Sequence, residues 1–120
     1  MTMTIESTDF GRITINGKTY SHDVIIHLSG KIAKRKKKLS TKEFGTSHLI
    51  SKNEIKAIYE KGATQLVLGT GQYGHLRLSP EAADYLQRKG CRLFAEPTFE
   101  AIDSYNRSNE QKIGLFHVNC

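Results

Sequence analysis

Along the second half of the chain, short apolar runs bounded by turn residues alternate with segments whose apolar residues recur at the spacing of a helix. Leu66 to Leu68 form a continuous apolar run, which is typical of a buried strand. The run ends in Gly69-Thr70-Gly71-Gln72-Tyr73-Gly74, where glycines allow positive φ and close backbone approach. We therefore expect the chain to leave a sheet at this point, beside a crevice that could admit a ligand.

The first part of the chain predicts antiparallel strands. Residues 10–15 alternate in polarity and then meet Asn16-Gly17, a strong hairpin signal. The return strand is expected to start at Lys18 and to continue through residues 23–28. Residues 31–48 show no sustained apolar period, so they predict a long loop or excursion, and such loops in compact domains are usually functional or mobile.

Helices are predicted between the later strands. Ser51-Lys52-Asn53-Glu54 is a capping box, in which the Ser51 hydroxyl and the Glu54 carboxylate each accept a backbone N–H. Further helices are predicted to start at Ser79-Pro80-Glu81 and at Pro97-Thr98, with strands at 65–68, 91–95 and 112–118. Strands that alternate with helices indicate parallel pairs with right-handed crossovers. We expect a single α/β domain over residues 1–120, with an open mixed sheet that includes the N-terminal hairpin.

Composition narrows the class of protein. The chain of 120 residues is 38% hydrophobic and 25% charged, which suits a soluble globular domain. Its start has neither a basic nor an apolar leader segment, and no apolar run approaches membrane-spanning length, so a cytoplasmic location without membrane insertion is expected. The two cysteines, Cys91 and Cys120, belong at opposite edges of the predicted sheet, and free thiols are expected.

The net charge of +6 is local. Seven of the 18 basic residues lie between Lys31 and Lys42, and the remaining 11 face 12 acidic residues. Clustered lysines could bind nucleic acid or another polyanion through phosphate charges, with Lys34, Arg35, Lys36, Lys37 and Lys38 as the contacts. The segment has no aromatic residue for base stacking before Phe44, so a solvated loop is the alternative interpretation.

Candidate binding residues follow the predicted strand ends. In open α/β sheets, ligands bind outside the carboxyl ends of the strands. These ends carry amides, a hydroxyl, an imidazole and a thiol, and a helix N-terminus beside a histidine suits an anion. The candidate ligand-binding residues are Gly69, Thr70, Gly71, Gln72, Thr98, His117 and Cys120. The alternative is a structural role, with Thr98 capping its helix and His117 satisfied in the core.

Other chemistry is weakly indicated. Residues 69–74 match the dinucleotide pattern GxGxxG, but residues 75–78 intervene before the next helix, whereas a fingerprint glycine loop opens directly into a helix. His117 and Cys120 alone do not complete a structural zinc site, and no third group orients them as a nucleophilic pair. We assign no catalytic residue, no metal and no cofactor from the sequence.

From Ser51 to Cys120 the chain resembles the Mth-type domain family of small proteins of unknown function. This family was first described from a methanogen and has relatives among adipogenesis-associated proteins and a mitochondrial assembly factor of respiratory complex I. The N-terminal hairpin is also similar. The resemblance rests on residues 66–72, 78–81, 89–90, 97–98, Ala101, 105–106 and 116–120. The chain departs from the family pattern at two places. Between the hairpin and the first helix it has a lysine run where relatives often carry Trp and Arg, and it has Asn119 where they commonly carry Thr.

The resemblance implies a compact α/β domain with a shared surface at Gly69, Gly71, Thr98 and Cys120, but no reaction. The assembly role in the mitochondrial branch does not carry over to this chain. We therefore expect a binding or assembly module without enzymatic activity, which has a protein partner and an anion-accepting crevice. The alternatives are an enzyme for a small anionic or nucleotide-like substrate, and a polyanion-binding protein that uses residues 31–42.

Overall fold

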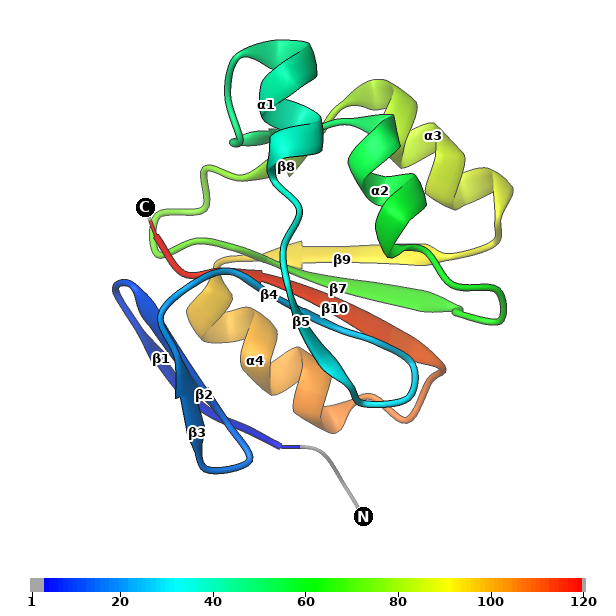
Figure 1. The fold of residues 1–120 in the computed structure, drawn as a ribbon. Helices are drawn as coiled ribbons and strands as arrows, with labels where there is room; N and C mark the ends of the chain where they lie inside the picture. The colour runs from blue at the N-terminus through cyan, green and yellow to red at the C-terminus, as the bar shows by residue number, and fades with distance from the viewer. Residues whose placement is uncertain (1–3, 120) are drawn as a thin grey trace.

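A five-stranded mixed sheet forms the centre of the computed structural model, which describes residues 4–119 (Figure 1). Its strands, in spatial order, are β5 (Ile32–Lys34), β4 (Val24–Ile26), β10 (Lys112–His117), β7 (Gln65–Thr70) and β9 (Arg92–Glu96). Strands β10, β7 and β9 are parallel, whereas β4 and β5 run antiparallel to their neighbours. The predicted α/β class with an open mixed sheet is confirmed.

Helices cover both faces of this sheet (Figure 1). Helices α2 (Lys52–Ile58) and α3 (Pro80–Arg88) lie on one face, and α4 (Thr98–Arg107) lies on the other. The buried strand β7 supplies both cores, because successive side chains point to opposite faces. Leu66 and Leu68 pack in the cluster of α2 and α3, while Val67 packs in the cluster of α4. Within residues 4–119, no helix has the length and apolar character needed to cross a membrane.

The N-terminal hairpin forms a sheet of its own and does not join the central sheet as expected. Its strands are β1 (Ile5–Asp9), β2 (Arg12–Ile15) and β3 (Lys18–Tyr20). The Asn16-Gly17 turn is confirmed, with both residues at positive φ, 49° and 82°. The inner side chains of this small sheet pack in the same buried cluster as Tyr105 of α4. It is therefore β4 and β5, and not the hairpin, that make the central sheet mixed.

The expected return strand from Lys18 to Leu28 is also divided. Residues 21–23 separate β3 from β4, and the two strands belong to different sheets. The break places Asp23 beside the last strand of the chain, where its carboxylate accepts hydrogen bonds from Val118 N and His117 Nδ1. A polar side chain with buried partners thus interrupts what the sequence predicts as one strand.

The prediction of a loop over residues 31–48 was wrong. The segment contains β5 and α1 (Lys38–Phe44), and it leads into β6 (Leu49–Ile50), which pairs in parallel with β8 (Arg77–Leu78). The only buried residue of α1 is Ser40, so this helix has no apolar stripe that a periodicity argument could detect. Polar contacts hold it in place, and they define the candidate site.

Candidate functional site

Thr98 joins the ends of two parallel strands to the start of α4. Its Oγ1 donates to the His117 carbonyl oxygen at 2.6 Å and accepts from the Gly71 amide at 2.9 Å. The helix N-cap is Pro97, so Thr98 is not the cap that the sequence suggests as one alternative. The structure does bring Gly71, Thr98 and His117 together. However, the Gly71 amide and the Thr98 hydroxyl, which were expected to face a ligand, form hydrogen bonds within the protein.

The glycine loop packs tightly against the same point. A Cβ atom at Gly69 would lie 2.8 Å from Thr98 Oγ1 and 2.9 Å from Phe116 Cδ1, so no side chain fits there. Thr70 ends β7 and is buried, and Gln72 is half-buried with an Nε2 atom that has no partner among residues 4–119. The loop then enters β8 and not a helix, which differs from a dinucleotide fingerprint. Cys120 lies outside the described residues.

His117 is the predicted residue with the most distinctive surroundings. Its side chain is 6% exposed, and Nδ1 lies 2.8 Å from Asp23 Oδ2. Because an ionised carboxylate only accepts, Nδ1 carries the hydrogen of this bond. Nε2 is buried and has no hydrogen-bond partner within the described residues, and the His48 ring packs edge-on at 5.6 Å between centroids. An imidazole oriented in this way can accept or donate a proton at Nε2.

Arg35 forms the centre of a buried ionic cluster that includes Asp23. Its guanidinium Nε and Nη2 donate to the two Glu54 oxygens at 2.6 and 3.1 Å, and Nη1 donates to Asp23 Oδ2 at 3.0 Å. Nη2 also donates to the Ser47 carbonyl oxygen at 2.7 Å. The Arg35 and Glu54 side chains are 1% and 0% exposed. Arg35 was predicted to contact a polyanion, but the guanidinium lies inside the protein on two carboxylates.

Serine hydroxyls complete the cluster and attach α1 to α2. The Ser40 hydroxyl donates to Glu54 Oε1 and accepts from the Ser51 amide. Ser51 caps α2 as predicted, since its Oγ accepts from Glu54 N at 3.1 Å. The other half of the capping box is wrong: the Glu54 carboxylate turns inward to Arg35, and Ser40 takes over the Ser51 amide.

Asp23 and Arg35 stabilise each other in their charged forms. Burial alone would raise the pKa of Asp23, but the hydrogen bond and charge of His117, with the hydrogen bonds from the Val118 amide and from Arg35, together hold that pKa below its ordinary value. Burial would likewise lower the pKa of Arg35, and the Glu54 and Asp23 carboxylates outweigh it, so this pKa is raised. Both groups are therefore ionised at neutral pH.

A small polar pocket opens beside the cluster, at the carboxyl end of β10. Its volume is about 160 Å³, and its lining is Ser21, His22, Asp23, Lys34, Arg35, Lys37 and Asn119. The register of the sheet explains why these lining residues lie together, because Val24 pairs with both Phe116 and Lys34. The segments before β4, after β5 and after β10 consequently meet at one end of the sheet, on its β10, β4 and β5 side.

Lys34 and Lys37 are the unpaired charges of this pocket. Both side chains are exposed, and neither makes an ion pair with another residue between 4 and 119. The nearby Asp23 carboxylate already accepts from three donors, namely Arg35, His117 and Val118. Lys36 and Lys38 are also exposed but do not line the pocket.

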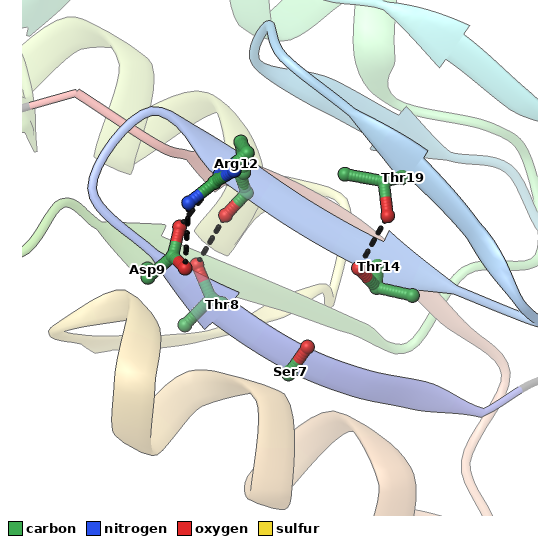
Figure 2. A pocket seen from close by; sticks show the side chains of 6 residues that line it. All are labelled: Ser7, Thr8, Asp9, Arg12, Thr14 and Thr19. Carbon is green, nitrogen blue, oxygen red and sulfur yellow. Dashed lines mark hydrogen bonds and ion pairs between the residues drawn. The ribbon is translucent and has the colours of Figure 1, made fainter.

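A second polar hollow, of about 240 Å³, lies on the hairpin sheet (Figure 2). Most of its polar groups bond to one another, and among the lining residues only the exposed Ser7 hydroxyl has no such partner. Arg12 binds Asp9 through Nε and Nη2 at 3.1 and 3.2 Å, and the Thr14 and Thr19 hydroxyls are 2.8 Å apart. Since no charge there is unpaired, this hollow is a weaker candidate than the pocket at Lys34 and Lys37.

Sequence reasoning missed Asp23, Glu54 and Ser40 as site residues. Asp23 was placed in a strand, Glu54 in a capping box and Ser40 in a loop. A signal was available for Arg35, the single arginine in a run of lysines, because arginine is the residue best suited to bidentate carboxylate binding in buried sites. This signal could not identify the partners of Arg35, because Asp23 and Glu54 are distant from it in sequence.

We predict that Arg35→Met lowers the free energy of unfolding by about 3–5 kcal/mol, because it leaves two buried carboxylates without their cation. Arg12→Met is the matched control, since it removes an arginine from an ion pair with side chains 63% exposed. The control should change stability by about 0.5 kcal/mol or less. Urea unfolding of the two variants measures the difference, and similar values for both would contradict a structural role for the cluster.

The lowered pKa of Asp23 predicts a specific acid sensitivity. Because the folded pKa lies below the ordinary 3.8, the stabilisation is present above that value and is lost as the pH falls through the folded pKa. In unfolding titrations between about pH 5 and pH 2, Asp23→Asn should make the loss of stability shallower than in the wild type. Asp84→Asn, at an exposed aspartate of α3, should keep the wild-type slope. Parallel curves for wild type and Asp23→Asn would refute the assignment.

Known proteins share the sequence pattern and the fold of this chain. A family model described as "Protein of unknown function (DUF498/DUF598)" matches residues 5–115. The chain is 34% identical to the conserved hypothetical protein PH1505 from Pyrococcus horikoshii OT3, with a TM-score of 0.87 and coverage of 98% of this chain and 99% of that one. It is 25% identical to the protein named MT938, with a TM-score of 0.85 and coverage of 99% and 100%.

A Bordetella pertussis protein described as a Mth938-like domain shares the fold at 16% identity, with a TM-score of 0.70 and coverage of 97% and 85%. The family match spans nearly the whole chain, and the resemblance expected from the sequence is confirmed. The chain belongs to the DUF498/DUF598 family, the family of the Mth938-like domains.

Proposed function

We propose that the protein is a binding module that accepts an anionic group in the pocket at Lys34 and Lys37. The observation that carries this proposal is the pair of unpaired lysines beside a carboxylate whose oxygens are already engaged. An incoming carboxylate or phosphate oxygen would gain charge-assisted hydrogen bonds from the two ammonium groups. It would not have to displace an existing ion pair.

The buried cluster keeps the pocket in shape. Arg35 lies between the two lysine positions along the chain, and its guanidinium is fixed by Glu54, Asp23 and Ser47. The Arg35 amide also donates to the Asp23 carbonyl at 3.1 Å, which extends the pairing of β4 and β5. The backbone under both lysines is therefore held before a ligand arrives, and such preorganisation reduces the ordering cost of binding.

Further groups around the pocket favour a small, oxygen-rich ligand. The His22 Nδ1 atom donates to the Asp23 carbonyl at 2.9 Å, so Nε2 remains for a ligand. Asn119 supplies an exposed amide side chain. A volume of about 160 Å³ suits one carboxylate or phosphate group and not a whole nucleotide. The ligand would then be a small anion, or one acidic side chain of a protein partner.

An enzymatic role is the second candidate, and the Asp23–His117 pair is the observation that favours it. A carboxylate bound to Nδ1 fixes the tautomer of the imidazole and leaves Nε2 without a partner among residues 4–119. Within residues 4–119, no nucleophilic side chain is hydrogen-bonded to His117 Nε2. The binding role needs only the lysines and is preferred.

We predict that Lys34→Gln combined with Lys37→Gln weakens binding of inorganic phosphate by about tenfold or more, because two charge-assisted hydrogen bonds are lost. The measurement is an NMR titration that follows the amide signals of residues 21–23, 34–37 and 119. A glutamate-rich peptide serves as the second probe, and tighter binding of the peptide would indicate a protein partner over a free anion.

The matched control is Lys36→Gln combined with Lys38→Gln, which removes the same charge from neighbouring positions outside the pocket. It should leave phosphate affinity within about twofold of the wild type at moderate salt, where exposed charges are screened. Equal losses in both double variants would favour the polyanion interpretation of residues 31–42. No shift with either probe would overturn the proposal.

A further inference from the structure

Strand β9 forms an open edge of the central sheet. Among residues 4–119 it pairs with β7 alone, and it lies between the layers that contain α3 and α4 (Figure 1). None of its residues is buried, and Leu93 and Phe94 are each 37% exposed. Exposed apolar edge strands are templates for pairing with another strand, and proteins usually blunt them with lysine, proline or a bulge. Within Arg92–Glu96, β9 has no lysine, proline or bulge, and its two charges, Arg92 and Glu96, are of opposite sign.

The hydrogen bonds of β9 with β7 define which groups face outward. Arg92 N donates to the Thr64 carbonyl at 2.9 Å, and the parallel register runs from Arg92 opposite Gln65 to Glu96 opposite Gly69. In a parallel ladder, alternate residues bond to the same neighbour with both N–H and C=O. Arg92, Phe94 and Glu96 therefore bond to β7, while the N–H and C=O groups of Leu93 and Ala95 face outward.

These outward groups permit one well-matched antiparallel pairing of β9 with itself. With the two-fold axis at Phe94, Leu93 lies opposite Ala95 of the second copy, and all their outward groups exchange hydrogen bonds. Phe94 then meets its own counterpart, and Arg92 lies opposite Glu96 of the second copy on both sides of the axis. Aromatic pairs and opposite charges directly across strands both stabilise a sheet.

The neighbouring registers match less well. An axis at Leu93 would place Arg92 opposite Phe94, and an axis at Ala95 would place Phe94 opposite Glu96 and Leu93 opposite Pro97, which has no N–H. Both lose the two Arg92–Glu96 pairs. The sequence Arg-Leu-Phe-Ala-Glu is therefore complementary to itself in one register only.

The present contacts of these charges leave donors and acceptors for such pairing. Glu96 Oε1 accepts from Ser104 Oγ at 2.5 Å, and Glu96 Oε2 makes no hydrogen bond with another residue between 4 and 119. Arg92 Nη2 lies 3.1 Å from Glu110 Oε1 in an ion pair with side chains 61% and 42% exposed, and exposed pairs of this kind contribute little. The guanidinium also lies 5.6 Å from the centre of the Phe94 ring. Hollows beside β9, lined by Leu86 on the α3 side and by Ser104 on the α4 side, leave room for side chains of a second copy.

We propose that two copies of this chain associate through antiparallel pairing of β9 about a two-fold axis at Phe94, which joins the two central sheets into one. A two-fold contact uses the same surface on both copies and closes on itself. The pocket at Lys34 and Lys37 lies towards the opposite edge of the sheet, beside β5. The dimer is thus independent of the proposed anion binding.

A charge-swap experiment tests the pairing. Sedimentation equilibrium over about 1–500 µM should show a concentration-dependent dimer of the wild type. Arg92→Glu alone and Glu96→Arg alone should each weaken dimerisation by about tenfold to a hundredfold, since each change places like charges together twice. An equimolar mixture of the two variants should form a heterodimer, because opposite charges then face each other at both sites.

Arg88→Glu on α3 is the matched control, because it reverses an exposed arginine that lies outside β9 and does not line the hollows beside it, so it should leave the dimer unchanged. Amide exchange gives a second measurement. The Leu93 and Ala95 amides should become protected as concentration rises, whereas the Arg92 and Phe94 amides, already bonded to β7, should not change. A wild type that stays monomeric, or a mixture that fails to associate where the wild type does, would overturn the proposal.

Discussion

The burial of the Arg35 guanidinium is the interaction on which the rest of the polar architecture depends. Removing a cation from water is unfavourable by several kcal/mol, and only well-placed partners compensate for it. Here Glu54 binds in a bidentate manner and Asp23 binds the remaining nitrogen. These contacts connect β5 to α2 and to the segment before β4, and Ser40 brings α1 to the same carboxylate. Residues 35–44 have little other attachment, since Ser40 is the only buried residue of α1.

This arrangement divides the basic segment into a buried arginine and exposed lysines. Arg35 points inward and holds the chain, while Lys34 and Lys37 remain exposed on either side of it and line the polar pocket. Asp23 links this pocket to the end of β10, because it also binds His117 and the Val118 amide. Thr98 bonds the other side of β10 to the glycine loop. At this end of the sheet most buried polar groups bond to one another, and the Nε2 atoms of His117 and Gln72 have no partner among residues 4–119. Lys34 and Lys37 are the charges of the pocket that make no ion pair within these residues.

Local patterns in the sequence were sufficient for most of the fold. The Asn16-Gly17 turn, the caps at Ser51 and Ser79, and the buried strand predicted at 65–68 are each encoded within a few residues. All are present, and the strand extends to Thr70. The cluster could not be predicted in this way. Its members are drawn from positions 23, 35, 40, 54 and 117, and each fits a local role by itself: strand residue, surface cation, loop serine, capping acid or core histidine. The register of β4, β5 and β10 brings positions 23, 35 and 117 together, and helices α1 and α2 add positions 40 and 54. Thr98 and Gly71 were correctly expected to meet, but as a ligand site and not as partners of each other.

The most direct test of this account is the hydrogen exchange of the Arg35 Nε–H proton, which donates to Glu54 at 2.6 Å inside the protein. NMR at neutral pH can compare it with the Arg12 Nε–H proton, which donates to the exposed Asp9. Because the guanidinium is buried, we predict that the Arg35 proton exchanges only through opening of the cluster, and therefore at least about a hundredfold more slowly than the Arg12 proton. Exchange of the two protons at similar rates would show that the guanidinium is in contact with water, and would contradict the central role of the buried cluster.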